Sequence, residues 1–184
     1  EESDKLLSFN EIFLARLKNI AVMSAEDAID YGLTGPCLRA SGVDYDVRKA
    51  APYSVYDRFD FDVPIGLDGD CWDRYYLRVQ EVYQSIRIVE QALDKLPDGE
   101  VTSSLGRRLL RPPAGEVYVR GENPRGEIGV YLNSDGSDKP YRIKVRPPSF
   151  CNLSALRQML KDSWIADSVV ILGALDIVLG EVDR

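Results

Sequence analysis

One acidic side chain, Asp176, lies in the most apolar neighbourhood of the sequence, the run VVILGALDIVLGEVDR at residues 169–184. An ionised carboxylate in such surroundings needs a charged or hydrogen-bonding partner, or its pKa rises because burial disfavours the charged form. A carboxylate of this kind can hold or transfer a proton. The alternative is that Asp176 only caps or hydrogen-bonds a local turn. The residues alone favour that alternative, since structural ion pairs also perturb pKa values.

Arg125 is the second candidate for chemistry. It stands between Pro124 and Gly126 in ENPRGEIG, and these neighbours favour a tight loop just before a predicted strand. A guanidinium on such a loop can point into a cavity. It can also pair with Glu122 or Glu127 at the surface, and the local pattern alone favours the surface pair.

Other chemistries are excluded by residues that the chain lacks. Among its 184 residues there is no histidine, which excludes Ser/His and Cys/His catalysis and histidine-ligated zinc or haem. Cys37, Cys71 and Cys151 form no CxxC pair, so we expect free thiols in a reducing compartment and no iron–sulfur cluster held within the chain. We therefore expect no stoichiometric nickel, iron or zinc. Neither GxxxxGK[ST] nor GxGxxG occurs, so no nucleotide-binding loop is predicted.

Composition narrows the class of protein further. The formal net charge is -7 and the pI is about 4.7, which disfavours nucleic acid as a partner because phosphate binding depends on clustered Lys and Arg. The longest apolar stretch, residues 168–182, contains Asp176 and Glu181 and is too short and too acidic to span a bilayer. The sequence begins without a secretory pattern. We expect a soluble chain that forms a single domain, or a fragment of one, over residues 1–184.

Helical spacing dominates the first hundred residues. Residues 5–31 predict two helical pieces, the second of them capped by Ser24, and residues 33–49 predict a loop or short irregular pieces. Residues 52–64 predict an extended segment. A long helix is predicted from about Asp70, its cap, to Leu96. We interpret its apolar stripe as core; the stripe consists of Trp72, Tyr75, Tyr76, Val79, Val82, Ile86, Val89 and Leu93.

From Glu116 the period changes to two, which predicts a β-hairpin with one buried face and one basic face. The basic face either binds an anion or, as we favour in so acidic a chain, is simply solvated; it carries Arg142, Lys144 and Arg146. Pro147 and Pro148 end the hairpin, and Asn152 is predicted to cap a closing helix through Val169. The fold class expected is α+β and helix-dominated, with a long central helix and a hairpin before the C-terminal helix.

Several stretches resemble the quinone-site core subunit of respiratory complex I. They follow the family's order and cover nearly the whole chain: LTGPCLRASGVDYDVRK, PYSVYDRFDFDVPIGLDGDCWDRYYLRV, QSIRIVEQAL, PRGEIGVYLNSDGSDKPYRIKVRPPSF and LDIVLGEVDR. The resemblance is to the C-terminal half of that subunit. It implies a fragment with a fold similar to the large subunit of nickel–iron hydrogenases.

The resemblance also implies roles for single residues. In the hydrogenases the final motif reads DPCxxC; here Asp176 matches the Asp, while Val178 and Glu181 stand at the two cysteine positions. Without those thiolates a nickel–iron centre cannot be held, and the complex I subunit uses the vacated cavity for quinone. Arg125 matches the arginine of the PRGE loop that faces this cavity. The resemblance thus reverses the preference from the residues alone: it implies that Arg125 and Asp176 act in catalysis and that Val178 lines the quinone chamber, with Arg146, Asp183 and Arg184 as further candidates nearby.

The same resemblance implies the setting. The chain would bind no cofactor, with quinone as the substrate of the complex and NAD bound elsewhere in it. Its partners would be other complex I subunits, among them the iron–sulfur subunit beside the quinone site and the missing N-terminal half, which holds the family's histidine and tyrosine quinone ligands. It would lie peripherally on the cytoplasmic side of the inner or plasma membrane, with no transmembrane segment. FCNLSAL stands where FxHLxAL is common in the family; such departures favour the alternative, a non-catalytic scaffold or assembly fragment.

Overall fold

The structure is a computed structural model that describes residues 4–100, 102 and 111–183. Part of the connector predicted after the long helix, and Arg184, lie outside the described residues. Of the described residues, 45% are helical and 14% are in strands. The helix-dominated α+β class predicted from the sequence is therefore confirmed.

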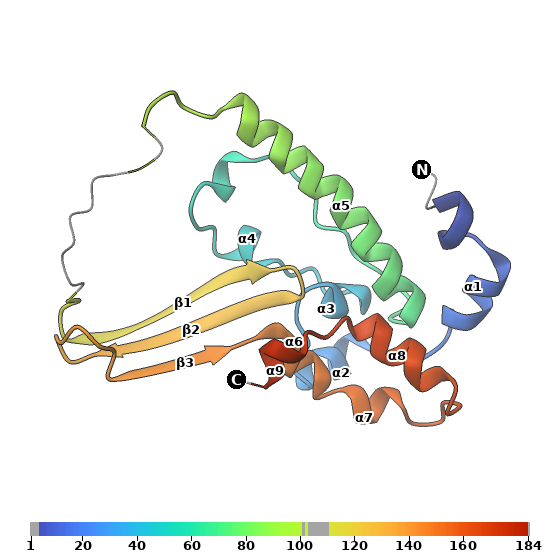
Figure 1. Cartoon of the computed structure of the whole chain (residues 1–184). Coiled ribbons are helices and arrows are strands. Elements are labelled where there is room, and N and C mark those ends of the chain that lie inside the picture. The colour runs from blue at the N-terminus through green and yellow to red at the C-terminus, as the bar shows by residue number, and fades with distance from the viewer. Residues whose placement is uncertain (1–3, 101, 103–110, 184) are drawn as a thin grey trace.

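The elements follow one another in a simple order along the chain. They are η1 (Asp4–Ser8), α1 (Glu11–Leu17), α2 (Ala25–Asp30), α3 (Pro36–Ala40), α4 (Val47–Ala50), η2 (Tyr56–Arg58), α5 (Cys71–Asp94), β1 (Gly115–Asn123), β2 (Gly126–Ser134), β3 (Arg142–Arg146), α6 (Pro148–Leu153), α7 (Leu156–Met159), α8 (Asp167–Leu175) and α9 (Leu179–Val182). Figure 1 shows α5 crossing the molecule above a cluster of short helices, with the sheet extending away to one side.

The long helix α5 begins as predicted. The Asp70 side chain accepts a hydrogen bond from the Asp73 backbone N–H at 2.9 Å and so caps the first turn. Near this end α5 contacts α1, α3 and α8, and Cys71 and Leu77 are buried in the core. The second half differs from the prediction of a buried stripe: its apolar side chains are about half exposed or more, namely Val82, Ile86, Val89 and Leu93.

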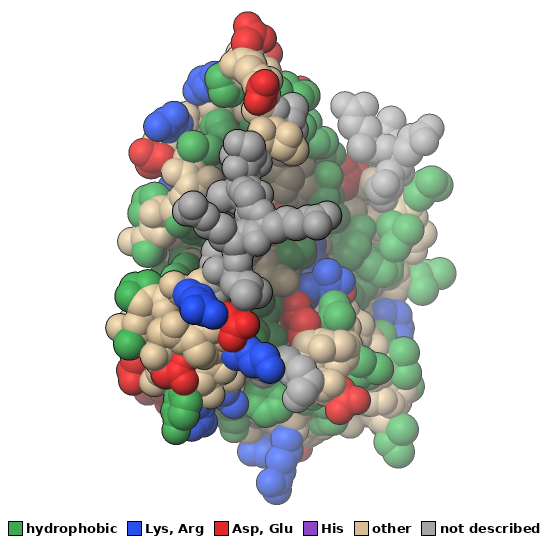
Figure 2. All heavy atoms as spheres, turned by 60° about the vertical axis from the view of Figure 1, so that its left-hand side comes forward, with side chains coloured by type: hydrophobic (Ala, Val, Ile, Leu, Met, Phe, Trp, Pro, Cys, Tyr) green, Lys and Arg blue, Asp and Glu red, His purple; other side chains and the backbone are tan. Residues whose placement is uncertain are grey.

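The predicted hairpin is present and is extended by a third strand. β1 pairs with β2 and β2 with β3, all antiparallel, in the order β1-β2-β3. The buried face expected for the hairpin does not form. Val117, Val119 and Ile143, which were expected on it, are 48%, 57% and 52% exposed. The physical reason is that the far part of the sheet projects beyond the helices in Figure 1, so no helix of the described residues packs on it there. Figure 2 accordingly shows hydrophobic side chains on the surface among charged ones.

The remaining sequence predictions have mixed outcomes. Ser24 caps α2 as predicted, accepting from the Asp27 N–H at 3.0 Å. Residues 33–49 contain two short helices, α3 and α4, within irregular chain, and residues 52–64 are irregular apart from the single turn η2. The prediction of one closing helix from Asn152 through Val169 is wrong, because three short helices, α6, α7 and α8, cover that range. Asn152 lies inside α6, fully buried, and caps nothing.

The core joins segments that are distant in sequence. It gathers buried side chains of α1, α2, α3, α5, α7 and α8, among them Leu17, Ala28, Cys37, Met159 and Ile171. The three cysteines are free thiols, as expected. No helix of the described residues is both long enough and apolar enough to cross a bilayer.

Candidate functional site

Arg125 and Asp176 are 51 positions apart in the chain but lie side by side in the fold. The Arg125 Nε atom is 3.3 Å from Asp176 Oδ2, and Nη2 donates a hydrogen bond to Oδ1 at 3.3 Å. Nε also donates to the Asp176 backbone carbonyl at 3.3 Å. The structure thus brings the two candidates together, whereas their chemical role stays a prediction.

The turn that carries Arg125 is held by close backbone packing. Gly126 follows directly, and a Cβ atom placed on it would lie 2.7 Å from Thr34 Cγ2. Its φ of 137° is likewise one that glycine adopts readily and other residues do not. The buried Asn152 joins both sides of this contact: its Oδ1 accepts from the Thr34 N–H at 2.9 Å, and its Nδ2 donates to the Arg125 carbonyl at 3.3 Å. These contacts fix the direction in which Arg125 leaves the sheet.

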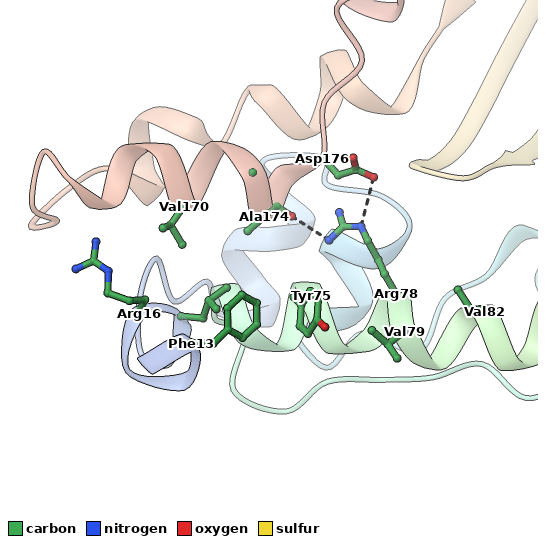
Figure 3. A pocket seen from close by; sticks show the side chains of 11 residues that line it. Phe13, Arg16, Tyr75, Arg78, Val79, Val82, Val170, Ala174 and Asp176 are labelled. Atoms are coloured by element: carbon green, nitrogen blue, oxygen red, sulfur yellow. Dashed lines mark hydrogen bonds and ion pairs between the residues drawn. The ribbon is translucent and has the colours of Figure 1, made fainter. Parts of the chain in front are cut away.

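Asp176 ends α8 and is flanked by a second arginine. Its backbone is left-handed, with φ of 52°, and its N–H donates to the Gly173 carbonyl at 3.1 Å. From α5, the Arg78 Nε atom lies 3.6 Å from Asp176 Oδ2, while Nη1 donates to the Ala174 carbonyl at 3.0 Å (Figure 3). Two guanidinium groups therefore face one carboxylate, and the local charge is positive.

The prediction that Asp176 is a buried acid is wrong for this chain. Its side chain is 39% exposed and that of Arg125 is 30% exposed. The left-handed turn after Leu175 directs the side chain away from the apolar packing of α8 and toward Arg78 and Arg125. At this exposure an ion pair stabilises the fold by only about 0–1 kcal/mol.

Two cavities meet at Asp176. The first, of about 570 Å³, is mainly apolar and lies between α1, α5 and α8. Figure 3 shows labelled residues of its lining, with the rings of Phe13 and Tyr75 side by side, Val170 and Ala174 on α8, and the Arg78–Asp176 contact nearby. The second, of about 400 Å³, is polar; its charged lining is Arg48, Arg78, Glu81, Glu122 and Asp176. Asp176 and Arg78 therefore stand between an apolar compartment and a polar one.

Val178, the predicted quinone contact, lies two residues beyond Asp176. It is half-buried, it precedes α9, and its N–H donates to Ser149 Oγ at 3.2 Å. It is not among the residues that line the two cavities at Asp176. At the other former cysteine position, the Glu181 carboxylate accepts from the Ser149 N–H at 3.2 Å.

The structure describes two of the three further candidates. Arg146 contacts Glu127 at 3.8 Å, and Asp183 follows α9 directly. Arg184 is outside the described residues. Within the described part of the chain, no cluster of three or more Cys, Asp or Glu side chains is arranged to hold a metal ion.

The surface pairs considered for Arg125 do not form. Glu122 faces Arg39 instead, at 3.8 Å. Glu127 accepts a 2.6 Å hydrogen bond from the Tyr45 hydroxyl and lies 3.7 Å from Arg120. Burial of the phenol, together with this bond to a carboxylate, raises the pKa of Tyr45 to about 12.

Arg78 is the site residue that the sequence analysis missed. It follows Arg74 by four residues in the first half of α5, which places both on the same face of the helix. Arg74 is fully buried, and its Nη2 donates to the Ala21 and Gly69 carbonyls at 2.8 and 2.7 Å. The signal available was two arginines beside an apolar stripe, because such cations enter a core only when they have partners.

Comparison with known proteins identifies the family. The chain matches the family described as "Respiratory-chain NADH dehydrogenase, 49 Kd subunit" over residues 1–111 and 104–184. It belongs to this family. The resemblance of its motifs to the core subunit of respiratory complex I is thereby confirmed.

Individual relatives agree over the same range. The chain is 54% identical to the D-type subunit of NADH-quinone oxidoreductase from Desulforamulus reducens over 183 residues, which is 100% of this chain and 50% of that protein. It is 53% identical to the corresponding subunit of Dehalococcoides mccartyi (100% and 50%) and 54% identical to that of Bacillus cereus (97% and 49%). The chain therefore spans about half the length of the curated relatives it matches.

Proposed function

We propose that the chain forms one wall of the quinone-reducing site of a multisubunit NADH-quinone oxidoreductase. The observation that carries the proposal is the meeting of Arg125, Arg78 and Asp176 beside an apolar cavity, in a chain of this family. A quinone has an apolar ring and two carbonyl oxygens, so it needs both kinds of surroundings. Guanidinium donors can bind a carbonyl oxygen and stabilise the negative charge that develops on it during reduction.

Within this site each residue has a distinct task. The family resemblance assigns to Arg125 the donor that faces the ligand; among the described residues it lines neither cavity, and Asp176, which lines both, holds its guanidinium in position through two 3.3 Å contacts. Arg78 binds the same carboxylate from α5 and keeps its charge balanced. The family resemblance assigns to Val178, which is half-buried and outside the lining of both cavities, an apolar contact with the quinone ring.

The partners follow from the surfaces that the chain leaves open. The second half of α5 exposes Val82, Ile86, Val89 and Leu93, and an apolar stripe of this length on a monomer marks a packing surface. We assign it to the other half of the subunit, since the chain spans half the length of its relatives. The iron–sulfur subunit beside the quinone site would deliver the electrons, and NAD would bind elsewhere in a complex attached peripherally to the cytoplasmic side of the membrane.

The test is a pair of substitutions in the assembled complex. Arg125→Ala and Asp176→Asn should lower quinone reduction by about a hundredfold to a thousandfold, because one positioned charge-stabilising group in a reacting site contributes at that level. Reduction of a hydrophilic acceptor that bypasses quinone should stay unchanged, which shows that the complex is assembled. Asp135→Asn, in the exposed turn between β2 and β3, is the matched control.

The competing function is a scaffold that keeps the fold without activity. The partial exposure of Arg125 and Asp176 favours it, because an open pair is a poor reaction site. Full quinone reduction in both variants would exclude the catalytic proposal and leave the scaffold.

A further inference from the structure

A second group of charges surrounds the polar cavity and lies mostly out of water. It consists of Arg39 of α3, Asp46 and Arg48 at the start of α4, Glu81 of α5 and Glu122 of β1. The side chains of Arg39 and Asp46 are each 1% exposed, and that of Glu122 is 14% exposed. We call this group the buried charge cluster.

The cluster contains more carboxylates than cations. Within the cluster two arginines face three acids, so one carboxylate lacks a cation of its own when all are ionised; Arg78 opens onto the same cavity but pairs with Asp176. An unbalanced charge in such surroundings is costly, and the usual outcome is that one group binds a proton and becomes neutral. The geometry decides which acid this is.

Asp46 and Glu81 have direct partners and Glu122 does not. Asp46 accepts from Arg48 Nη2 at 2.6 Å and from Arg48 Nε at 3.0 Å, and Glu81 contacts the Arg39 guanidinium directly. The Glu122 carboxylate has, among the described residues, only Arg39 Nη2 as an ionic contact, at 3.8 Å. That distance is too long for a hydrogen bond. Glu122 is therefore the acid with the weakest support for its charged form.

The pKa values of the two acids follow the same ranking. Burial, together with the nearby negative charges of Asp46 and Glu81, raises the pKa of Glu122 to about 7, although Arg39 and Arg48 act in the opposite direction. For Asp46, burial acts upward, but the hydrogen bonds and charge of Arg48 outweigh it and lower the pKa. Glu122 thus changes charge near neutral pH while Asp46 stays ionised.

The position of Glu122 connects it with the ligand compartment. It lines the polar cavity together with Asp176 and Arg78, so all three open onto one space of about 400 Å³. Eight titratable or charged groups interact with Glu122 or line the same cavity: Arg39, Asp46, Arg48, Tyr53, Tyr56, Arg78, Glu81 and Asp176.

We propose that Glu122 is the proton-exchanging carboxyl of the polar cavity: it takes up one proton from solvent when negative charge enters the cavity at Arg78 and Asp176, and it releases that proton when the charge leaves. The carboxylate gains the proton and becomes a neutral acid, and no other bond changes. The identity of the charge, a quinone gaining electrons, rests on the function proposed above. The exchangeable proton on Glu122 does not.

The first measurement addresses the proton directly. In the assembled complex the infrared C=O band of a protonated carboxylic acid should titrate with a midpoint at about pH 7. Glu122→Gln should remove this titrating band, and Glu122→Asp should shift it. Glu116→Gln, an exposed acid at the other end of the same strand, should leave it unchanged. An unchanged band in Glu122→Gln would overturn the proposal.

The second measurement addresses the coupling. With a short-chain quinone as the probe, kcat should fall by up to about tenfold per pH unit above about pH 7, because reduction of the bound quinone then requires proton uptake. Glu122→Gln should abolish this fall and Glu116→Gln should keep it. A fall that persists in Glu122→Gln would overturn the assignment. If the proposed function is wrong, the result differs. The complex with Asp176→Asn then reduces quinone normally, while the infrared band of Glu122 in the wild-type complex still titrates.

Discussion

The turn that carries Arg125 depends on an approach of two backbones so close that a single methyl group should disrupt it. In Gly126→Ala the new Cβ would lie 2.7 Å from Thr34 Cγ2 and 2.8 Å from the Gly35 nitrogen, distances at which the chain must move. The φ of 137° adds strain of about 1–3 kcal/mol for any residue with a side chain. Overpacking of a tight contact costs a further amount of about 1–3 kcal/mol. We expect the free energy of unfolding to fall by about 2–6 kcal/mol.

Urea unfolding followed by far-UV circular dichroism measures this change. Gly180→Ala is the control, since a Cβ there meets nothing within 4 Å and its backbone lies in a helix. It should be neutral or stabilise by up to about 1 kcal/mol. Because the shifted turn also moves Arg125, Gly126→Ala should weaken quinone reduction in the complex. A loss of stability below about 1 kcal/mol would show that Thr34 and Gly35 yield easily and that the turn is not rigidly placed.

Two further predictions concern the charges and the exposed helix. Asp46→Asn should lower the free energy of unfolding by about 3–5 kcal/mol in urea unfolding, because the Arg48 and Arg39 guanidinium groups then lose a buried carboxylate partner. The pKa of Asp46 is lowered below its ordinary value of 3.8, so the ionised carboxylate stabilises the fold fully above about pH 4, and this stabilisation is lost as the pH falls further. A wild-type chain whose free energy of unfolding does not fall in acid would contradict this. Because the apolar stripe of α5 is uncovered in the isolated chain, we expect that chain to self-associate through it. Val89→Asp, at a position that is 56% exposed, should reduce this association in sedimentation velocity, whereas the neighbouring Glu90→Gln should not; equal association of both would show that α5 is not the contact surface.

Local signals predicted local structure well. Asp70 caps α5 and Ser24 caps α2, because a side chain that accepts from a backbone N–H within three residues needs nothing from the rest of the fold. The period-two pattern predicted the hairpin for a similar reason, although not its third strand. The same rule failed at Asn152, whose side chain bonds Thr34 and Arg125, 118 and 27 positions away in the chain.

Burial was predicted less well than secondary structure. The stripe on α5 and the apolar face of the sheet were expected in the core, yet Ile86 is 50% exposed and Val119 57%. A hydrophobic pattern shows that a face is made to be covered, but it does not show which polypeptide covers it. The chain spans half of its relatives' length, and under the function proposed here the other half of the subunit supplies part of the cover.

By itself, the sequence determined the class of the fold, the elements that local caps and periods define, and the exclusion of histidine chemistry. The resemblance in its motifs added the pairing of Arg125 with Asp176. Only the tertiary structure decided that Arg78 also binds Asp176, that this acid is open to solvent, and that Glu122 is the poorly supported member of a buried charge cluster. The physical reason is that caps and periods act over a few residues, whereas charge balance and burial depend on α3, α4, α5 and β1 meeting in space.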